Sequence, residues 1–434
     1  MGRALHLGRH GRNAALPVGP PARPGARGRG VTRLDDQPWL TAPQTRAVIA
    51  ALEAAGGSGC ARFVGGCVRN ALIGQPVDDI DIATTLTPEA VMAAIKAAGL
   101  KAAPTGLAHG TVTAIAEGHP HEVTTLRRDV STDGRNATVA FTRDWAEDAG
   151  RRDFRLNALY AGPDGEVFDP TGQGVEDALA GRIVFVGEPE TRIREDYLRI
   201  LRFFRFHAWY GRGPADAAGL KACADLKDGM TRLSAERVSK ELLKLLAAPD
   251  PAPALRLMAK SGVLDRVLPD HAGLTLFEAM VRVSPDALLR LSALLPADAD
   301  RVRASARALR LSNAQKERLV LALPAEPAVS LGMDERAGRA ALYRLGRRRF
   351  EDQVRRAWAA APEQENAARR LLDQAAVWLV PRLPVDGHDA ARAGASGPAV
   401  GRTLGAFEDW WVDQDFPEGD HLAMLDRFLP RTPK

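Results

Sequence analysis

The chain has 434 residues, of which 45% are hydrophobic and 26% are charged. These fractions are typical of a folded globular protein and exclude a chain that is mainly disordered or fibrous. Charged or glycine residues interrupt the apolar runs well before the ~18 residues that a membrane-spanning helix requires, so no membrane span is predicted. The three cysteines, Cys60, Cys67 and Cys223, match neither a disulfide framework nor a zinc motif, and a reducing cytoplasm is the expected compartment.

Charge is distributed unevenly along the chain. The net charge is +5, but residues 1–33 contain seven arginines and no acidic residue, so the other 401 residues carry a net charge of −2. Any contact with a nucleic acid must then come from local basic clusters rather than from the overall charge. We predict that residues 1–38, rich in Arg, Gly and Pro, form a disordered tail; an RNA-contacting arm and a targeting segment are the alternatives.

A mixed pattern of helices and strands begins at Trp39. Short β-branched or apolar runs between turn residues predict strands, and apolar residues at helical spacing predict the helices between them. Thr41 is a candidate N-cap for the first helix, and Pro88 suits the first turn of a helix that ends at Gly99. The predicted strands are 61–64, 80–83, 111–116, 122–126 and 183–186, and a polar loop with an Asp133-Gly134 turn is predicted over 128–143.

The second half of the chain has a different pattern. From about residue 175 strand signals become sparse, and Ala, Leu and Arg recur at helical spacing between clusters of proline. We therefore predict an α+β fold in which a small mixed-sheet domain precedes a long all-α region. The predicted domains are the tail over 1–38, a sheet-containing head over 39–175, a helical neck over 176–250, and a helical body and tail over 251–434.

A glycine pair followed by a cluster of acids is the strongest local motif. Gly65 and Gly66 lie between a predicted strand and a predicted helix, where backbone N–H groups can approach an anion that Arg69 could also reach. Asp79 and Asp81 are two residues apart on a predicted strand, so their carboxylates are expected on one face. Two such oxygen ligands suit Mg²⁺ and phosphoryl transfer. A tight turn capped by aspartates is the alternative interpretation.

A third carboxylate lies on a nearby predicted strand. Glu122 begins the run Glu122-Val123-Thr124-Thr125, and a neighbouring strand could bring it beside the aspartate pair to complete a metal site. The alternative is a glutamate that faces solvent on the strand.

Three further segments extend this pattern: Arg151-Arg152-Asp153-Phe154-Arg155-Leu156-Asn157-Ala158, Arg194-Glu195-Asp196-Tyr197-Leu198-Arg199 and Leu233-Ser234-Ala235-Glu236-Arg237. Together with the glycine and aspartate motifs, they resemble the class II CCA-adding and poly(A) polymerase family of template-independent nucleotidyltransferases. The resemblance covers about residues 39–270. It implies a polymerase-β-like nucleotidyltransferase head followed by an all-α neck, body and tail.

The resemblance also implies an activity and a set of site residues. The activity is addition of C, C and A to the 3′ end of tRNA from CTP and ATP, with release of pyrophosphate and Mg²⁺ as the cofactor. Asp79, Asp81 and Glu122 would be catalytic, with the two aspartates holding the metal. The nucleotide would be bound by a larger set, namely Gly65, Gly66, Arg69, Arg152, Asp153, Asn157, Asp196, Arg199, Arg202 and Arg205. The helical body would hold tRNA, and nothing in the sequence assigns an oligomeric state.

Base selection can also be argued from the residues. Asp196, Arg199 and Arg202 recur every three residues and are predicted on one broad face of a helix, with Arg205 further round. A salt-bridge ladder on a solvated face is the alternative. A carboxylate that accepts the amine of C or A, beside an arginine that donates to the ring nitrogen, satisfies both bases. Guanine and uracil reverse both polarities, at about 1–3 kcal/mol for each buried mismatch.

Three residues depart from the family pattern. Asn70 replaces an aspartate and so removes a charge beside Arg69, whereas Arg155 and Tyr197 replace smaller residues without removing a proposed catalytic group. The alternatives within the family are a poly(A) polymerase and an enzyme that adds only part of the CCA end. The retained segment 128–143 disfavours an enzyme that adds only C, and the acidic C-terminal stretch disfavours a poly(A) polymerase. An inactive RNA-binding protein is the alternative of a different class.

Overall fold

The computed structural model describes residues 31–133, 136–324 and 328–429, which fall into two compact units. Within the described residues, the first unit comprises 31–127, 141–148 and 157–175, and the second comprises the remainder. Residues 1–30 of the predicted tail lie outside the described residues, as do Gly134 and Arg135 of the predicted polar loop.

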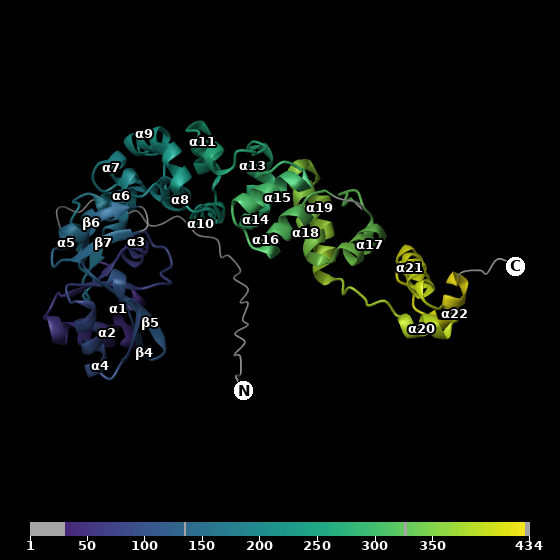
Figure 1. Ribbon diagram of the computed structural model, residues 1–434, viewed down its shortest axis with the longest axis horizontal. Coiled ribbons are helices and arrows are strands. Elements are labelled where there is room, and N and C mark those ends of the chain that lie inside the picture. The colour runs from purple at the N-terminus through teal and green to yellow at the C-terminus, as the bar shows by residue number, and fades with distance from the viewer. Residues whose placement is uncertain (1–30, 134–135, 325–327, 430–434) are drawn as a thin grey trace. The chain divides into compact units, whose positions relative to one another are not determined.

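A mixed sheet forms the centre of the first unit (Figure 1). Its strands, in the order β3-β4-β5-β2-β1-β8-β9, are all antiparallel to their neighbours except β2 and β5, which are parallel. The bounds are β1 (Ala61–Val64), β2 (Asp81–Thr84), β3 (Lys101–Gly106), β4 (Thr111–Ala116), β5 (His119–Thr125), β8 (Tyr160–Ala161) and β9 (Val167–Phe168). The strands predicted over 61–64 and 111–116 are confirmed with their boundaries.

Helices cover one face of this sheet. α2 (Pro43–Gly56) and α4 (Pro88–Ala97) contact each other and pack against β4 and β5 through buried side chains such as Leu52 and Ile95. The helix start at residue 88 is confirmed, because the Thr87 hydroxyl accepts a hydrogen bond from the amide of Ala90 (3.3 Å). The other elements here are α1 (Pro38–Thr41), α3 (Gly66–Leu72), η1 (Leu107–His109) and most of α5 (Trp145–Gly150), whereas η2 (Arg155–Asn157) and α6 (Gly174–Ala180) lie mainly in the second unit.

Three local predictions were wrong. Thr41 does not cap α2, which begins at Pro43 after Ala42, because a proline is favoured at the first helical position. The segment 128–143 is not a loop: β6 (Arg127–Asp133) and β7 (Asn136–Phe141) form a separate two-stranded sheet. Its sequence places β-branched residues on both sides of the Asp133-Gly134 turn signal, which is a hairpin pattern. The predicted strand over 183–186 is reduced to one isolated bridge between Phe154 and Phe185.

In the described part of the chain after residue 175, the second unit is helical and confirms the predicted change of pattern (Figure 1). Its interior includes an aromatic cluster in which Phe154, Phe185, Phe203 and Phe206 contact one another. None of the described helices is long and apolar enough to span a membrane. The first half contains α7 (Pro189–Glu195), α8 (Leu198–Tyr210), α9 (Ala217–Leu226), η3 (Lys227–Arg232), α10 (Ala235–Leu246), α11 (Ala252–Lys260), α12 (Val263–Val267) and α13 (Thr275–Val283).

Prolines lie between several helices in the rest of this unit, for example Pro381 and Pro384 between α19 and α20. The helices are α14 (Ala287–Leu294), α15 (Ala299–Ala308), α16 (Asn313–Leu321), α17 (Glu335–Leu345), α18 (Arg347–Ala360), η4 (Pro362–Gln364), α19 (Glu365–Val377), α20 (Gly387–Arg392), α21 (Pro398–Asp413), α22 (His421–Leu425) and η5 (Asp426–Phe428). The α+β fold class is therefore observed, with a mixed-sheet N-terminal region followed by helices.

The helix predicted to carry Asp196 is interrupted at that residue. α7 ends at Glu195 and α8 starts at Leu198, while Asp196 is extended (φ −154°, ψ 107°). The Asp196 carboxylate accepts a hydrogen bond from the Leu198 amide (3.1 Å), and such side-chain-to-backbone bonds compete with the helical ladder. The spacing predicted Asp196 and Arg199 on one continuous helical face, and this prediction was wrong.

Candidate active site

Two of the three predicted catalytic carboxylates lie opposite each other in the first unit. Asp81 on β2 pairs with Glu122 on β5 in parallel register, and Glu122 also pairs with Thr113 on β4. Paired residues on adjacent strands project from the same face of the sheet. Asp81 is half-buried and Glu122 is exposed. The neighbouring-strand placement of Glu122 is therefore observed, while its role in catalysis stays a prediction.

Asp79 lies outside the strand on which the sequence placed it. The ladder of β2 begins at Asp81, so Asp79 belongs to the exposed segment before the strand. Strand alternation therefore does not fix the Asp79 carboxylate on the face of Asp81, although both residues line the same cavity.

This cavity, of about 610 Å³, lies at the start of β2 and beside the first half of β5, where the acids are. Next to Glu122, His121 is 2% exposed, and its Nε2 lies 3.1 Å from the hydroxyl of Thr45 on α2. Burial lowers the pKa of His121, which keeps the imidazole neutral at neutral pH. The full lining is Trp39, Ala42, Gln44, Thr45, Asp78, Asp79, Ile80, Asp81, Thr113, His119, Pro120, His121 and Glu122.

The donor set of this cavity fits a hard divalent cation. Asp79, Asp81 and Glu122 supply carboxylate oxygens, and Mg²⁺ is commonly held by one or two carboxylates together with water and substrate phosphates. Among the described residues, no group of three or more His, Cys, Asp or Glu side chains is close enough together to hold a metal ion by itself. A metal at this site would therefore take part of its ligand shell from the substrate or from water.

The glycine pair has two different local roles. Gly65 precedes α3 with φ 74°, a conformation that favours glycine, and its amide donates to the carbonyl of Leu159 (3.0 Å). Gly66 is more open: a Cβ there would contact only the Arg69 guanidinium, at 3.9 Å. Because the Gly65 amide is already used, Gly66 is the residue of the pair whose surroundings leave room for a ligand.

Arg69 is held in place by two asparagines of the same unit. Its Nη1 donates to Oδ1 of Asn157, and its Nε and Nη2 donate to Oδ1 of Asn70 at 3.1 and 2.8 Å. Asn70 is itself oriented by donating to the carbonyl of Pro76 (2.7 Å). Arg69 is only 6% exposed, so these contacts fix the guanidinium. The neutral Asn70 thus keeps the hydrogen bonds that the family's aspartate was expected to supply.

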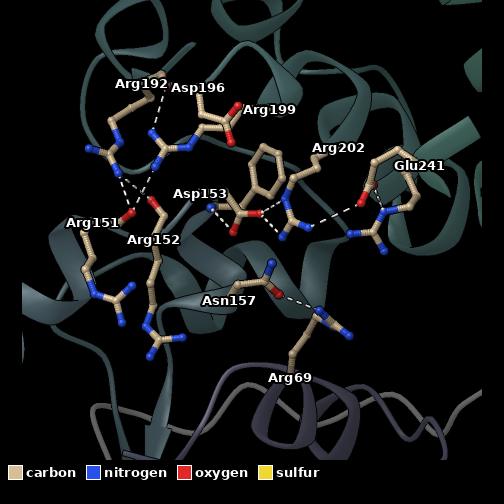
Figure 2. Close-up of polar contacts among 12 residues, drawn as sticks. Arg69, Arg151, Arg152, Asp153, Asn157, Arg192, Asp196, Arg199, Arg202 and Glu241 are labelled. Carbon is tan, nitrogen blue, oxygen red and sulfur yellow. Dashed lines mark hydrogen bonds and ion pairs between the residues drawn. The ribbon is translucent and has the colours of Figure 1, made fainter. Parts of the chain in front are cut away.

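In the second unit, two backbone carbonyls bind arginines of α7 and α8 (Figure 2). Nη2 of Arg192 donates to the carbonyls of Arg151 (2.5 Å) and Arg152 (3.2 Å), and Nη2 of Arg199 donates to that of Arg151 (3.2 Å). Glu195 pairs with both Arg192 and Arg199 (2.7 and 2.6 Å). The side chains of Arg151 and Arg152 extend away from this cluster.

A row of alternating charges continues along α8 (Figure 2). Arg202 donates from Nε to Asp153 (2.8 Å) and lies 3.8 Å from Glu241 of α10, which in turn binds Nε of Arg205 (2.6 Å). Burial acts to lower the pKa of Arg202, but the carboxylates of Asp153 and Glu241 outweigh it and raise that pKa. Burial lowers the pKa of Arg205 despite Glu241. Because both acids are less than a tenth exposed, the row is a fixed part of the fold.

Asp196 is bound from α10. Its Oδ2 accepts from Nη2 of Arg237 (2.6 Å), and its Oδ1 accepts from the amide of Leu198 (3.1 Å). An ionised carboxylate offers about four acceptor sites. Since no other group in the described ranges binds this carboxylate, two acceptor sites remain for a ligand.

The hydrogen bonds of Arg199 use only some of its N–H donors. Nη1 donates to the carbonyl of Arg192 (2.8 Å) and to Glu195, and Nη2 donates to the carbonyl of Arg151. A guanidinium has five N–H donors. Among the described residues nothing accepts from the Nε–H or from one Nη2–H, so Arg199 has two donors for a ligand.

Four residues that the sequence analysis did not assign to the site bind the side chains of residues that it did assign. Arg192 and Glu195 bind around Arg199, Arg237 binds Asp196, and Glu241 binds Arg202 and Arg205. The i, i+4 spacing of Arg237 and Glu241 on α10 places both on one side of that helix, which was the available signal.

Comparison with known proteins gives separate matches for the sheet-containing region and for part of the helical region. A family model described as the poly A polymerase head domain matches residues 61–184. A second, described as the probable RNA and SrmB-binding site of polymerase A, matches residues 217–274. The fold and the two matches define a nucleotidyltransferase with a polymerase-type head. Members of this class typically use a divalent metal ion.

Relatives that match over more of the chain identify the family within this class. CCA tRNA nucleotidyltransferase 1, mitochondrial, of Danio rerio is 35% identical over 369 residues, 81% of this chain and 83% of that protein. The CCA-adding enzyme of Geobacillus thermodenitrificans is 40% identical over 47% of this chain and 49% of that protein. The crystal structure of the Bacillus stearothermophilus CCA-adding enzyme in complex with CTP superposes with a TM-score of 0.72 at 27% identity, over 89% of this chain and 98% of the other. The chain belongs to the CCA tRNA nucleotidyltransferase family.

Proposed function

We propose that this chain adds C, C and A to the 3′ end of tRNA, taking the nucleotides from CTP and ATP and releasing pyrophosphate without a nucleic-acid template. The names of its relatives support the proposal, because the Danio rerio protein is a CCA tRNA nucleotidyltransferase and the superposed bacterial structure holds CTP. The observation that carries it is the pairing of Asp81 with Glu122 at a cavity that Asp79 also lines.

The first unit supplies the groups for the transfer step in this proposal. Asp79 and Asp81 would hold Mg²⁺, with Glu122 beside them. The metal would activate the 3′-hydroxyl of the RNA and neutralise charge on the triphosphate. Gly66 and Arg69 bind phosphate, and Asn70 and Asn157 keep the Arg69 guanidinium in one orientation. No covalent intermediate with the enzyme is needed, because positioning and charge stabilisation are sufficient.

The second unit supplies base selection. The remaining acceptor sites of Asp196 take the exocyclic amine of C or A, and the remaining donors of Arg199 serve the ring nitrogen. Guanine and uracil would place acceptor against acceptor and donor against donor. Arg152, Asp153, Arg202 and Arg205 support the nucleotide or the groups that bind it.

The helices that follow bind tRNA in this proposal. The match to a probable RNA-binding region covers α9 to α12. On α15, Arg303 and Arg307 are exposed, and exposed guanidinium groups suit contacts to the RNA backbone.

The test is nucleotide addition to tRNA that lacks its 3′ CCA. Purified protein is incubated with this RNA, Mg²⁺ and each nucleotide singly and in combination. Addition that stops after C, C and A supports the proposal, long A tails indicate a poly(A) polymerase, and addition of C alone or A alone indicates a partial enzyme. RNA binding without any addition would contradict the proposal.

One variant tests base selection separately from a general loss of nucleotide binding. Asp196→Ala should relax the choice of base more than it weakens binding of the triphosphate. Asp225→Ala is the matched control, because Asp225 is an exposed aspartate on α9 that pairs with Lys221. Unchanged discrimination in Asp196→Ala would show that this carboxylate does not read the base.

The compartment is a separate part of the proposal. Cys60, Cys67 and Cys223 are buried and unpaired, and burial raises the pKa of the Cys67 thiol to about 11. Unpaired thiols suit a reducing compartment, so we assign the cytoplasm. Cell fractionation tests this, and recovery in an organelle, as the name of the Danio rerio relative indicates for that protein, would overturn it.

A further inference from the structure

The junction between α7 and α8 consists of two residues and carries the proposed base-reading carboxylate. Asp196 is extended, and the next residue, Tyr197, is the N-cap of α8. The amide of Ile200 donates to the carbonyl of Tyr197 (3.2 Å), so the start of α8 is tied to this residue. Any displacement of Tyr197 therefore acts directly on its covalent neighbour Asp196.

The ring of Tyr197 rests on a glycine of η3. A Cβ built at Gly229 would overlap Cε1, Cδ1 and Cζ of the Tyr197 ring, so no side chain fits at this position while the ring stays in place. Arg232, from the same element, has its guanidinium carbon 5.5 Å from the ring centroid. η3 thus forms a seat for one aromatic ring.

Glycine is required at position 229 by space and not by backbone conformation. Gly229 is not among the described glycines with positive φ, so another residue could adopt its dihedral angles. The close approach of the Tyr197 ring is the remaining reason for a glycine.

η3 has further contacts besides the one with the Tyr197 ring. Next to Gly229, the side chain of Met230 is 5% exposed and Asp228 pairs with Arg266 of α12 (2.6 Å). The amide of Leu233 donates to the carbonyl of Met230 (3.0 Å) and closes η3. Because Met230 is buried and the Leu233 amide closes η3, we expect a methyl group at position 229 to displace the ring and not the seat.

We propose that Gly229 is a positioning residue for base selection, because it seats the Tyr197 ring and so fixes the direction in which Asp196 presents its carboxylate. The inference rests on the proposed function and adds a residue that does not touch the nucleotide. A shift of about 1 Å in a positioning group can cost about 10²-fold in rate. The seat therefore contributes to discrimination between C and U as well as to stability.

The test compares Gly229→Ala, Tyr197→Ala, the double variant and Tyr197→Phe with the wild type. The quantity measured is the ratio of kcat/KM for CTP to kcat/KM for UTP on truncated tRNA. Gly229→Ala should lower this ratio about tenfold or more. The double variant should have the same ratio as Tyr197→Ala, because without the ring the residue at position 229 has nothing to displace. Tyr197→Phe should keep the wild-type ratio, because the ring remains. A merely structural defect would lower both rate constants equally and leave the ratio unchanged.

Gly405→Ala is the matched control, since a Cβ at Gly405 of α21 meets no atom within 4 Å. An unchanged ratio in Gly229→Ala, or a double variant whose ratio differs from that of Tyr197→Ala, overturns the inference. If Gly229→Ala does not fold, Tyr197→Trp replaces it, because a larger ring on the intact seat should also lower the ratio and an unchanged ratio overturns the inference.

Failure of the proposed function gives a different result. A wild-type chain that adds neither C nor A contradicts that function whatever the variants do. The seat is then tested by equilibrium binding of CTP and UTP to the wild type and to Gly229→Ala. A lower preference for CTP in the variant supports the seat, and an equal preference overturns it.

Discussion

The acidic cavity of the first unit and the charged row of the second are built in opposite ways. Asp79 and Glu122 are exposed, and Asp81 is half-buried. In the second unit, by contrast, Asp153 is 8% exposed and bound to Arg202, and Glu241 is 6% exposed and shared between two arginines.

This difference separates two physical tasks. Carboxylates that receive a metal ion from solution must remain accessible, whereas groups that discriminate between bases must be oriented before the base arrives. Substitutions in the first unit should therefore change activity with little change in stability, and substitutions in the charged row should change stability directly.

The largest expected effect is in the cavity. Asp81→Asn should lower the rate of nucleotide addition about 10²- to 10³-fold, because an amide is a poor ligand for Mg²⁺ and does not neutralise its charge. Single-turnover addition to truncated tRNA measures the loss, and the melting temperature should stay near that of the wild type. Asp78→Asn, at an exposed aspartate of the same cavity, is the control and should remain within about tenfold of the wild type.

The charged row should respond in stability. Glu241→Gln weakens the binding of Arg202 and Arg205 and should cost about 1–3 kcal/mol in the free energy of unfolding, measured by urea denaturation. Glu236→Gln on the same helix is the control, because the Glu236 side chain is 59% exposed, and it should change stability by less than about 0.5 kcal/mol. Equal effects of the two substitutions would contradict the contrast between the units.

A smaller effect is expected at the support of Arg69. Asn70→Ala removes the acceptor of two guanidinium hydrogen bonds and should raise KM for CTP about 3- to 10-fold. Asn70→Asp keeps the acceptor and should stay within about threefold of the wild type. If Asn70→Ala leaves KM unchanged, Asn157 alone is sufficient to orient Arg69.

The smallest expected effect is a dependence of stability on pH. Burial lowers the pKa of His207 on α8 below its usual 6.5, so the unfolded chain binds a proton at a higher pH than the folded chain does. Stability from the neutral His207 is therefore present above about pH 6.5 and is lost as the pH falls towards the lowered pKa. His207→Gln should reduce the drop in melting temperature between pH 7.5 and 5.5, whereas His388→Gln, an exposed histidine, should not.

The sequence predicted the elements that local patterns determine. The strands over 61–64 and 111–116 are runs bounded by glycine or a turn, and the helix beginning at Pro88 has its threonine cap. The strand containing Asp81 was predicted one residue early, over 80–83, and Asp79 precedes both the predicted and the observed strand.

The sequence could not predict contacts between distant segments. The pairing of Asp196 with Arg237 joins residues 41 positions apart, and spacing along the chain contains no information on it. The interruption of the helix at Asp196 was missed because a periodic pattern of Asp and Arg continues across it, while a side-chain hydrogen bond to the backbone ends the helix. The roles assigned to the site residues stay predictions until the variants are measured.

The order of the strands has a consequence for synthesis of the protein. β1 has β2 on one side and β8 on the other, and β8 and β9 follow in the chain only after the β6–β7 hairpin and α5. A nascent chain released at Arg127 would leave the free edge of β1 without its partner, with backbone donors and acceptors unpaired. All seven strands of the sheet are present only once the ribosome has translated beyond Phe168.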